Sequence, residues 1–167
     1  MRTRLVWVAA AIALVAAGWT AGRAQSTRGT LTPQDYVEIQ NLYARYVRSM
    51  DMGAVNGGDE YVSLYTPDGA FNENKGPDAL RKMMQGFWTR TRQAGWVSRH
   101  VYSGLMVTPT PEGANGSAYY LVWNVTAKPP LVDHSSVIED TLVKTRDGWK
   151  FKQRIYRANE TFKPGMP

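Results

Sequence analysis

Residues 32–51 read TPQDYVEIQNLYARYVRSMD and carry the clearest helical pattern in the chain. Thr32 can cap a helix that starts at Pro33 and has Asp35 in its first turn. Asp51 lies one helical turn beyond Val47, so the apolar face of this helix ends in a carboxylate. Apolar residues recur every three or four positions and predict an amphipathic helix up to about Asp51: Tyr36, Ile39, Tyr43, Val47 and Met50.

Two further helices are predicted after this one. A short helix covers Asp59–Tyr65, and the turn Thr66–Gly69 leads into a short strand at Ala70–Asn72. A third helix runs from Gly76 to about Arg92, and we expect it to cover a sheet because its apolar residues share one side. These residues are Leu80, Met83, Met84, Phe87 and Trp88.

After Gly95 the apolar residues alternate with a period of two, which predicts β-strands. The segments between these strands are short and rich in glycine and proline, as in antiparallel hairpins. Helices followed by an antiparallel meander predict one α+β domain over Leu31–Phe162. The strands are expected at about Val97–Thr108, Ser117–Ala127, Val132–Thr145 and Trp149–Phe162.

The first 24 residues have the pattern of a secretion signal. Two arginines precede the apolar run Leu5–Ala17, and Gly22–Ala24 places small residues where signal peptidase cleaves. Cleavage near Ala24 would leave a linker (25–30), the domain (31–162) and a tail (163–167), in a periplasmic or secreted protein. The alternative is a retained membrane anchor, although a spanning helix needs ~20 apolar residues.

Composition narrows the possible functions. Part of the formal charge of +6 lies in the first 24 residues, and the other lysines and arginines are scattered without a basic run. Nucleic acid is therefore not an expected partner. The chain has no cysteine, which excludes disulfides, thiolate catalysis and thiolate metal ligands.

Four groups of residues, in their order and spacing, resemble the SnoaL-like branch of the nuclear transport factor 2-like superfamily. The resemblance spans about Leu31–Phe162 and implies a cone-shaped barrel, in which three N-terminal helices pack on a strongly curved antiparallel sheet around a pocket. Known members include dehydratases, isomerases, polyketide cyclases and epoxide hydrolases, which often need no metal or organic cofactor. The groups are Asn41–Tyr46 with Asp51, Leu64–Phe71, Ser98–His100 and Asp147–Lys150.

The chemical pattern is most similar to that of scytalone dehydratase and its relatives. Asp51 matches the acid at the end of the first helix, and His100 matches the histidine at the start of the first long strand; in that family the two form the acid/base pair. Other positions differ. Met50 and Glu73 stand where the dehydratase has tyrosines, and its second histidine falls near Asn124 or Thr126.

The residues themselves leave two interpretations of Asp51 and His100 open. A histidine that donates one ring N–H to a carboxylate is held in one tautomer, so its other nitrogen can exchange a proton with a substrate near neutral pH. Alternatively, Asp51 is a solvent-facing or turn-capping carboxylate, and His100 is a strand histidine bound to a backbone carbonyl.

Further residues are candidates for binding the substrate. The tyrosines would suit a flat aromatic ligand, although aromatic residues are also common in cores. Asn124 could bind a substrate oxygen or face solvent. Strand alternation sends one of Glu139 and Asp140 inward, either as an acid/base group or as a partner of Arg99 or Arg154. The candidates are Tyr43, Tyr46, Tyr120, Asn124 and Glu139.

The sequence therefore predicts an acid/base lyase or isomerase, similar to dehydratases, that acts on a small hydrophobic carbonyl or hydroxyl compound. No cofactor or metal is expected, because no zinc or iron ligand set, phosphate loop or nucleophile elbow is present. Two alternatives stay open: a non-catalytic ligand-binding or dimerisation module, and a polyketide cyclase-like enzyme. Tyr119, Leu121 and Trp123 share one strand face, and an outward position for it would favour a homodimer.

Overall fold

The computed structural model describes residues 29–52 and 58–158. The predicted signal peptide, most of the linker and the C-terminal tail lie outside the described residues. In the part that is described, no helix is long and apolar enough to cross a membrane.

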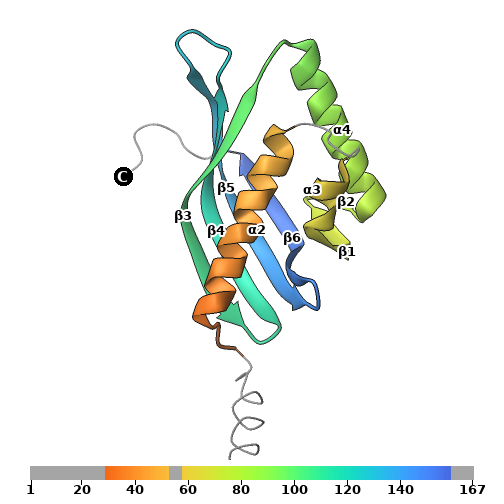
Figure 1. The fold of residues 1–167 in the computed structure, drawn as a ribbon, viewed down its shortest axis with the longest axis vertical. Helices are drawn as coiled ribbons and strands as arrows, with labels where there is room; N and C mark the ends of the chain where they lie inside the picture. The colour runs from red at the N-terminus through yellow and green to blue at the C-terminus, as the bar shows by residue number, and fades with distance from the viewer. Residues whose placement is uncertain (1–28, 53–57, 159–167) are drawn as a thin grey trace, which may run out of the picture.

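The described chain forms three helices and one six-stranded sheet, with strand order β2-β1-β6-β5-β4-β3. Figure 1 shows α2 lying along one face of the sheet, with α3 and α4 beside the β1 and β2 edge. In chain order the elements are α2 (Pro33–Asp51), α3 (Asp59–Ser63), β1 (Tyr65–Phe71), β2 (Asn74–Lys75), α4 (Pro77–Gln93), β3 (Ser98–Thr110), β4 (Gly113–Asn124), β5 (Leu131–Thr145) and β6 (Gly148–Ala158).

The predicted meander is correct for β3 to β6, whose three neighbouring pairs are all antiparallel. The expectation of a wholly antiparallel sheet is wrong, because β1 pairs parallel to β6, with Tyr65 opposite Phe151 and Phe71 opposite Arg154. β1 also starts earlier than predicted, since the Leu64 carbonyl already accepts a hydrogen bond of 2.9 Å from the Phe151 N–H. A parallel partner from the far end of the chain leaves no local signal in the sequence.

Helix α2 begins with the predicted cap. The Thr32 hydroxyl accepts from the Asp35 N–H at 3.2 Å, and the Asp35 carboxylate accepts from the Thr32 N–H at 2.9 Å. The buried face is rotated from the predicted one: Tyr36 is 41% exposed, whereas Leu42 and Tyr46 are buried with the expected Ile39 and Tyr43.

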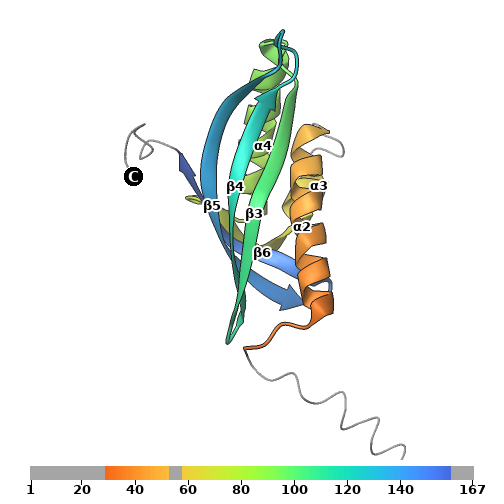
Figure 2. The ribbon, with the colours of Figure 1, turned by 90° about the vertical axis from the view of Figure 1, so that its left-hand side faces the viewer.

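The sheet curves strongly along its strands. Its pairing shifts register between Ser103 and Met106 and between Val122 and Trp123, and such bulges bend a strand. Figure 2 shows β3, β4 and β5 bending around the helices. On the α4 side, the Trp88 indole N–H donates to the Met50 carbonyl at 2.9 Å, which fixes the end of α2 just before Asp51.

Candidate active site

Asp51 and His100 lie in direct contact where the end of α2 meets the start of β3. The Asp51 Oδ1 atom is 2.6 Å from His100 Nδ1, and the His100 backbone N–H donates to both carboxylate oxygens at 3.2 Å. The His100 side chain is 2% exposed and that of Asp51 is 15% exposed. An ionised carboxylate can only accept, so Nδ1 carries the hydrogen and Nε2 is the ring nitrogen left for a substrate.

Aromatic rings surround the His100 imidazole. It stacks on Tyr120 with a centroid distance of 5.4 Å and lies 5.7 Å from the Phe87 ring. The Tyr120 hydroxyl donates to the Met50 sulfur at 3.3 Å, and burial raises the pKa of Tyr120 well above its usual range. The predicted pocket residue Tyr120 therefore faces inward, beside His100, as a protonated apolar wall.

A cavity of about 180 Å³ lies next to Asp51. It is formed between the end of α2, the second half of α4 and the start of β3. The Trp96 indole N–H, in its wall, is buried without a hydrogen-bond partner among the described residues. The cavity borders Asp51 and Phe87 but neither His100 nor Tyr120, and it is lined by Met50, Asp51, Met52, Phe87, Trp88, Thr91, Arg92, Trp96, Val97 and Ser98.

Deeper in the cone, Asp140 and Arg154 form a fully buried ion pair. Arg154 donates from Nε and Nη2 to the two Asp140 oxygens, each at 2.7 Å, and from Nη1 to the Tyr102 hydroxyl at 2.6 Å. Burial disfavours the charged guanidinium, but Asp140 outweighs this and keeps the pKa of Arg154 well above its usual range. Of the two partners predicted for an inward carboxylate here, Arg154 is the one observed.

The predicted pocket residues Tyr43 and Tyr46 hold this ion pair. The Tyr43 hydroxyl donates to Asp140, and burial raises the pKa of Tyr43 far above its usual range. The Arg154 guanidinium lies 3.9 Å from the centroid of the Tyr46 ring and 3.9 Å from that of Phe151. These aromatic groups pack around the buried guanidinium in the core of the domain.

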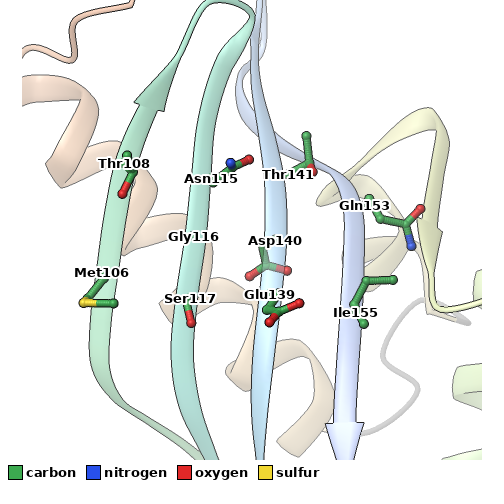
Figure 3. Close-up of a pocket in the computed structure, with 10 residues that line it drawn as sticks. All are labelled: Met106, Thr108, Asn115, Gly116, Ser117, Glu139, Asp140, Thr141, Gln153 and Ile155. Atoms are coloured by element: carbon green, nitrogen blue, oxygen red, sulfur yellow. The ribbon is translucent and has the colours of Figure 1, made fainter.

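The prediction that Glu139 lines the inner pocket is wrong, because the β5 register turns Asp140 inward and Glu139 outward. Glu139 accepts from Arg157 Nη2 at 2.7 Å on the outer surface. It borders a shallow groove of about 390 Å³ on the sheet face opposite α2, which Figure 3 shows. The groove is lined by Met106, Thr108, Asn115, Gly116, Ser117, Glu139, Asp140, Thr141, Gln153 and Ile155.

The side-chain oxygen of Asn124 accepts hydrogen bonds within the turn that follows β4. Its Oδ1 atom accepts from the Thr126 N–H at 3.0 Å, from the Thr126 hydroxyl at 2.7 Å and from the Ala127 N–H at 3.2 Å. The strand β4 ends here, before the predicted Ala127, because this side chain caps the turn that follows. The Asn124 amide oxygen is therefore used within the turn, and the expected role of its NH₂ group at a substrate oxygen stays a prediction.

Sequence reasoning did not identify Tyr156 or Phe87 as neighbours of the site. Tyr156 lies with its ring centroid 6.1 Å from that of Tyr120, and Phe87 packs on His100. Alternation along β6 and the apolar face of α4 were the available signals. Among residues 29–52 and 58–158, no group of three or more histidine, aspartate or glutamate side chains is arranged to hold a metal ion.

Comparison with known proteins agrees with this architecture. The sequence profile of the SnoaL-like domain matches residues 32–155. No curated protein matches significantly in sequence. Solved structures that match include Aln2 from a Streptomyces species, with 24% identity and a TM-score of 0.67 over 78% of this chain and 95% of that one.

Two other solved structures share the fold. ActVI-ORFA from Streptomyces coelicolor is 20% identical, with a TM-score of 0.66 over 79% of this chain and 100% of its own. An NTF2-like protein with a cystatin-like fold from Novosphingobium aromaticivorans is 22% identical, with a TM-score of 0.65 over 76% and 83% of the two chains.

Proposed function

The chain belongs to the family of SnoaL-like domains, which includes polyketide cyclases and isomerases, and we propose that it is an acid/base lyase or isomerase centred on His100. The observation that carries this proposal is the contact of 2.6 Å between Asp51 Oδ1 and His100 Nδ1. A buried imidazole oriented by a carboxylate is a suitable proton-transfer group near neutral pH.

In the proposed reaction, His100 Nε2 removes a proton from a carbon next to a carbonyl group. The C–H electron pair moves toward the carbonyl oxygen, and the positive charge left on the ring is stabilised by Asp51. Return of the proton to another atom completes an isomerisation, whereas departure of a hydroxyl group completes a dehydration. Both outcomes use the same first step.

The substrate class follows from the walls around His100. Phe87 and Tyr120 present ring carbons, and the Tyr120 hydroxyl is already bound to Met50. These surfaces favour a small, flat, hydrophobic compound with one carbonyl or hydroxyl group. A periplasmic or secreted location stays a prediction from the first 24 residues.

The test is hydrogen exchange at the carbon next to a ketone, measured by NMR in D₂O with benzylacetone and a panel of related aryl ketones. We expect the wild-type protein to exchange these hydrogens and His100→Gln to lose the activity. Asp51→Asn should reduce it by roughly 100-fold or more, because the ring is no longer held or its charge compensated. Asp59→Asn, which removes an exposed helix-end carboxylate, is the matched control.

A second measurement separates catalysis from structure. In the wild type, ¹⁵N NMR of the neutral imidazole should show hydrogen on Nδ1 of His100, and Asp51→Asn should give a mixture of the two tautomers. Full exchange activity in a folded His100→Gln protein, or no exchange by the wild type with any ketone of the panel, would show that the proposal is wrong.

A further inference from the structure

The cavity beside Asp51 has the size and the walls of a site for a small organic molecule. Its volume of about 180 Å³ equals that of about six water molecules in the liquid. It borders neither His100 nor Tyr120, so its occupant would be separate from a substrate at His100 Nε2. Most of its wall is apolar or aromatic and consists of Met50, Met52, Phe87, Trp88, Trp96 and Val97.

Two hydrogen-bond donors at this cavity have no partner within residues 29–52 and 58–158. The Trp96 indole N–H is buried without an acceptor. Arg92, an exposed residue in the last turn of α4, takes part in none of the ion pairs that the described residues form. An unpaired buried donor costs free energy, so an acceptor in the cavity would stabilise the protein. A carboxylate suits both donors, because it accepts charge-assisted hydrogen bonds from a guanidinium and a further bond from an indole.

Asp51 gives the same cavity a negative side. Its side chain is 15% exposed, and its ionic partner among the described residues is His100 and not Arg92. The Oδ2 atom accepts from the His100 backbone N–H at 3.2 Å, which leaves lone-pair capacity on this oxygen. Helix α2 ends at Asp51, and the C-terminal end of a helix attracts positive charge. An ammonium group therefore suits this side of the cavity, where the rings of Phe87 and Trp88 also attract it.

We propose that this cavity is a second binding site, and that its ligand is a small α-amino acid with an apolar side chain, bound as the zwitterion. The ammonium group of the ligand donates to Asp51 Oδ2. The carboxylate of the ligand accepts from Arg92 and from the Trp96 indole N–H. The apolar side chain packs on the aromatic and methionine side chains of the wall.

Simpler ligands leave part of this site unmatched. A small anion would pair with Arg92 but would be repelled by the Asp51 carboxylate. An amine without an acid group would pair with Asp51 but leave the Trp96 N–H without an acceptor. An apolar molecule would bury the Asp51 charge without a new partner. A zwitterion matches both sides and leaves the net charge of the cavity unchanged.

The ligand and His100 share one carboxylate in this arrangement. Asp51 Oδ1 lies 2.6 Å from His100 Nδ1, while the ligand uses Oδ2. Binding therefore places a positive group next to the carboxylate that orients the ring, and it leaves the Nε2 atom uncovered. The environment of the ring changes whether or not His100 is catalytic, so ring signals of His100 report on the contact with Asp51.

The test is an NMR titration of the ¹⁵N-labelled protein with L-valine. The Trp96 indole N–H signal, identified by its loss in Trp96→Phe, should shift saturably as the N–H gains an acceptor, and the His100 ring signals should shift with it. The Trp149 indole N–H, which donates to Asp35 at 3.0 Å, is the internal reference. Isovalerate lacks the ammonium group and isobutylamine lacks the carboxylate, and each should bind roughly 10-fold more weakly or worse.

A matched pair of variants tests the carboxylate end. Arg92→Gln should weaken valine binding by roughly 10-fold or more, because a charge-assisted hydrogen bond is lost. Arg90→Gln removes the same charge from the same turn of α4, but Arg90 does not line the cavity and its loss should leave the affinity close to that of the wild type. Trp96→Phe keeps an aromatic wall without the donor and should weaken binding as measured by calorimetry.

Four results would overturn the proposal. The first is the absence of a saturable shift with alanine, valine and leucine. The second is an equal loss of affinity in Arg92→Gln and Arg90→Gln, which would show a non-specific effect of charge. The third is isovalerate that binds as tightly as valine, and the fourth is an unchanged His100 ring at saturation, because either would exclude the contact with Asp51. The α-hydrogen exchange assay is independent of all four, so failure of this site and failure of the proposed function are distinguishable.

Discussion

Arg154 and Asp140 form a bidentate ion pair in the interior of the cone, with both hydrogen bonds at 2.7 Å and neither side chain exposed. Tyr43 and Tyr102 supply further hydrogen bonds to the pair. The ring of Tyr102 lies 5.3 Å from that of Tyr120, which in turn stacks on His100. The ion pair is therefore part of the core. Through Tyr102 it also supports the position of Tyr120 beside His100.

Removing one partner of this ion pair should be far more damaging than removing both. Asp140→Ala leaves a buried guanidinium without its counter-charge, and we expect a loss of roughly 3–5 kcal/mol in the free energy of unfolding. Asp140→Leu combined with Arg154→Met should cost less than Asp140→Ala alone. Urea unfolding measures the stability of both proteins, and a double variant that is no more stable than Asp140→Ala would contradict this account.

Gly116 is required by the position of the Tyr43 hydroxyl. A Cβ atom at residue 116 would overlap that hydroxyl, which is held in place by its hydrogen bond to Asp140. Gly116→Ala should therefore destabilise the fold by about 1–3 kcal/mol. Tyr43→Phe removes the overlapping oxygen, so the double variant should lose less stability than the sum of the two single variants. Strict additivity would show that the two positions do not compete for space.

Asp35 should make stability depend on pH in the acid range. Burial raises the pKa of its carboxyl group, but hydrogen bonds from Lys144, Thr32 and Trp149 outweigh burial, and the pKa lies well below its usual range. Folding thus favours the ionised form, so this stabilisation is complete above the unfolded pKa of about 4 and is lost as the pH falls toward the folded value.

The variant Asp35→Asn tests the predicted direction of this pH dependence. At neutral pH it should be less stable than the wild type by about 1–3 kcal/mol, because the charged acceptor is lost. The difference should shrink as the pH falls below about 4, where the wild-type carboxyl becomes protonated in the unfolded chain. Urea unfolding at several pH values measures it; a difference that is constant down to pH ~2 would contradict the assignment.

The outer face of β3 and β4 carries the apolar side chains expected of a homodimer interface. Tyr119 is 64% exposed there, next to exposed Val101 and Trp123. We expect the protein to sediment as a dimer and Tyr119→Glu to sediment as a monomer, because a buried unpaired charge opposes association. Val37→Glu, on the exposed side of α2, should leave the dimer intact. A monomeric wild type would exclude this interface.

Local patterns were sufficient to predict most of the elements. The cap at Thr32, the period of α4 and the alternation of β3 to β6 are all set by residues a few positions apart. The parallel pairing of β1 with β6 was missed, because its hydrogen bonds join a strand that precedes α4 to the last strand of the meander. The early end of β4 was missed because the Asn124 side chain stops the strand.

The site was only partly predictable. The resemblance singled out Asp51 and His100, which the fold brings into contact across 49 positions of sequence. The inward position of Asp140 could not be separated from that of Glu139, because a shift of one residue in register exchanges the two faces of a strand.

By itself, the sequence determined the class of fold and the order of helices and strands, because local periodicity and capping act over short distances along the chain. Tertiary structure alone decided which of two adjacent carboxylates is buried and what partners it finds. Those choices depend on strand register and bulges, which are fixed when the whole sheet closes on α2 and the most apolar combination of faces is removed from water.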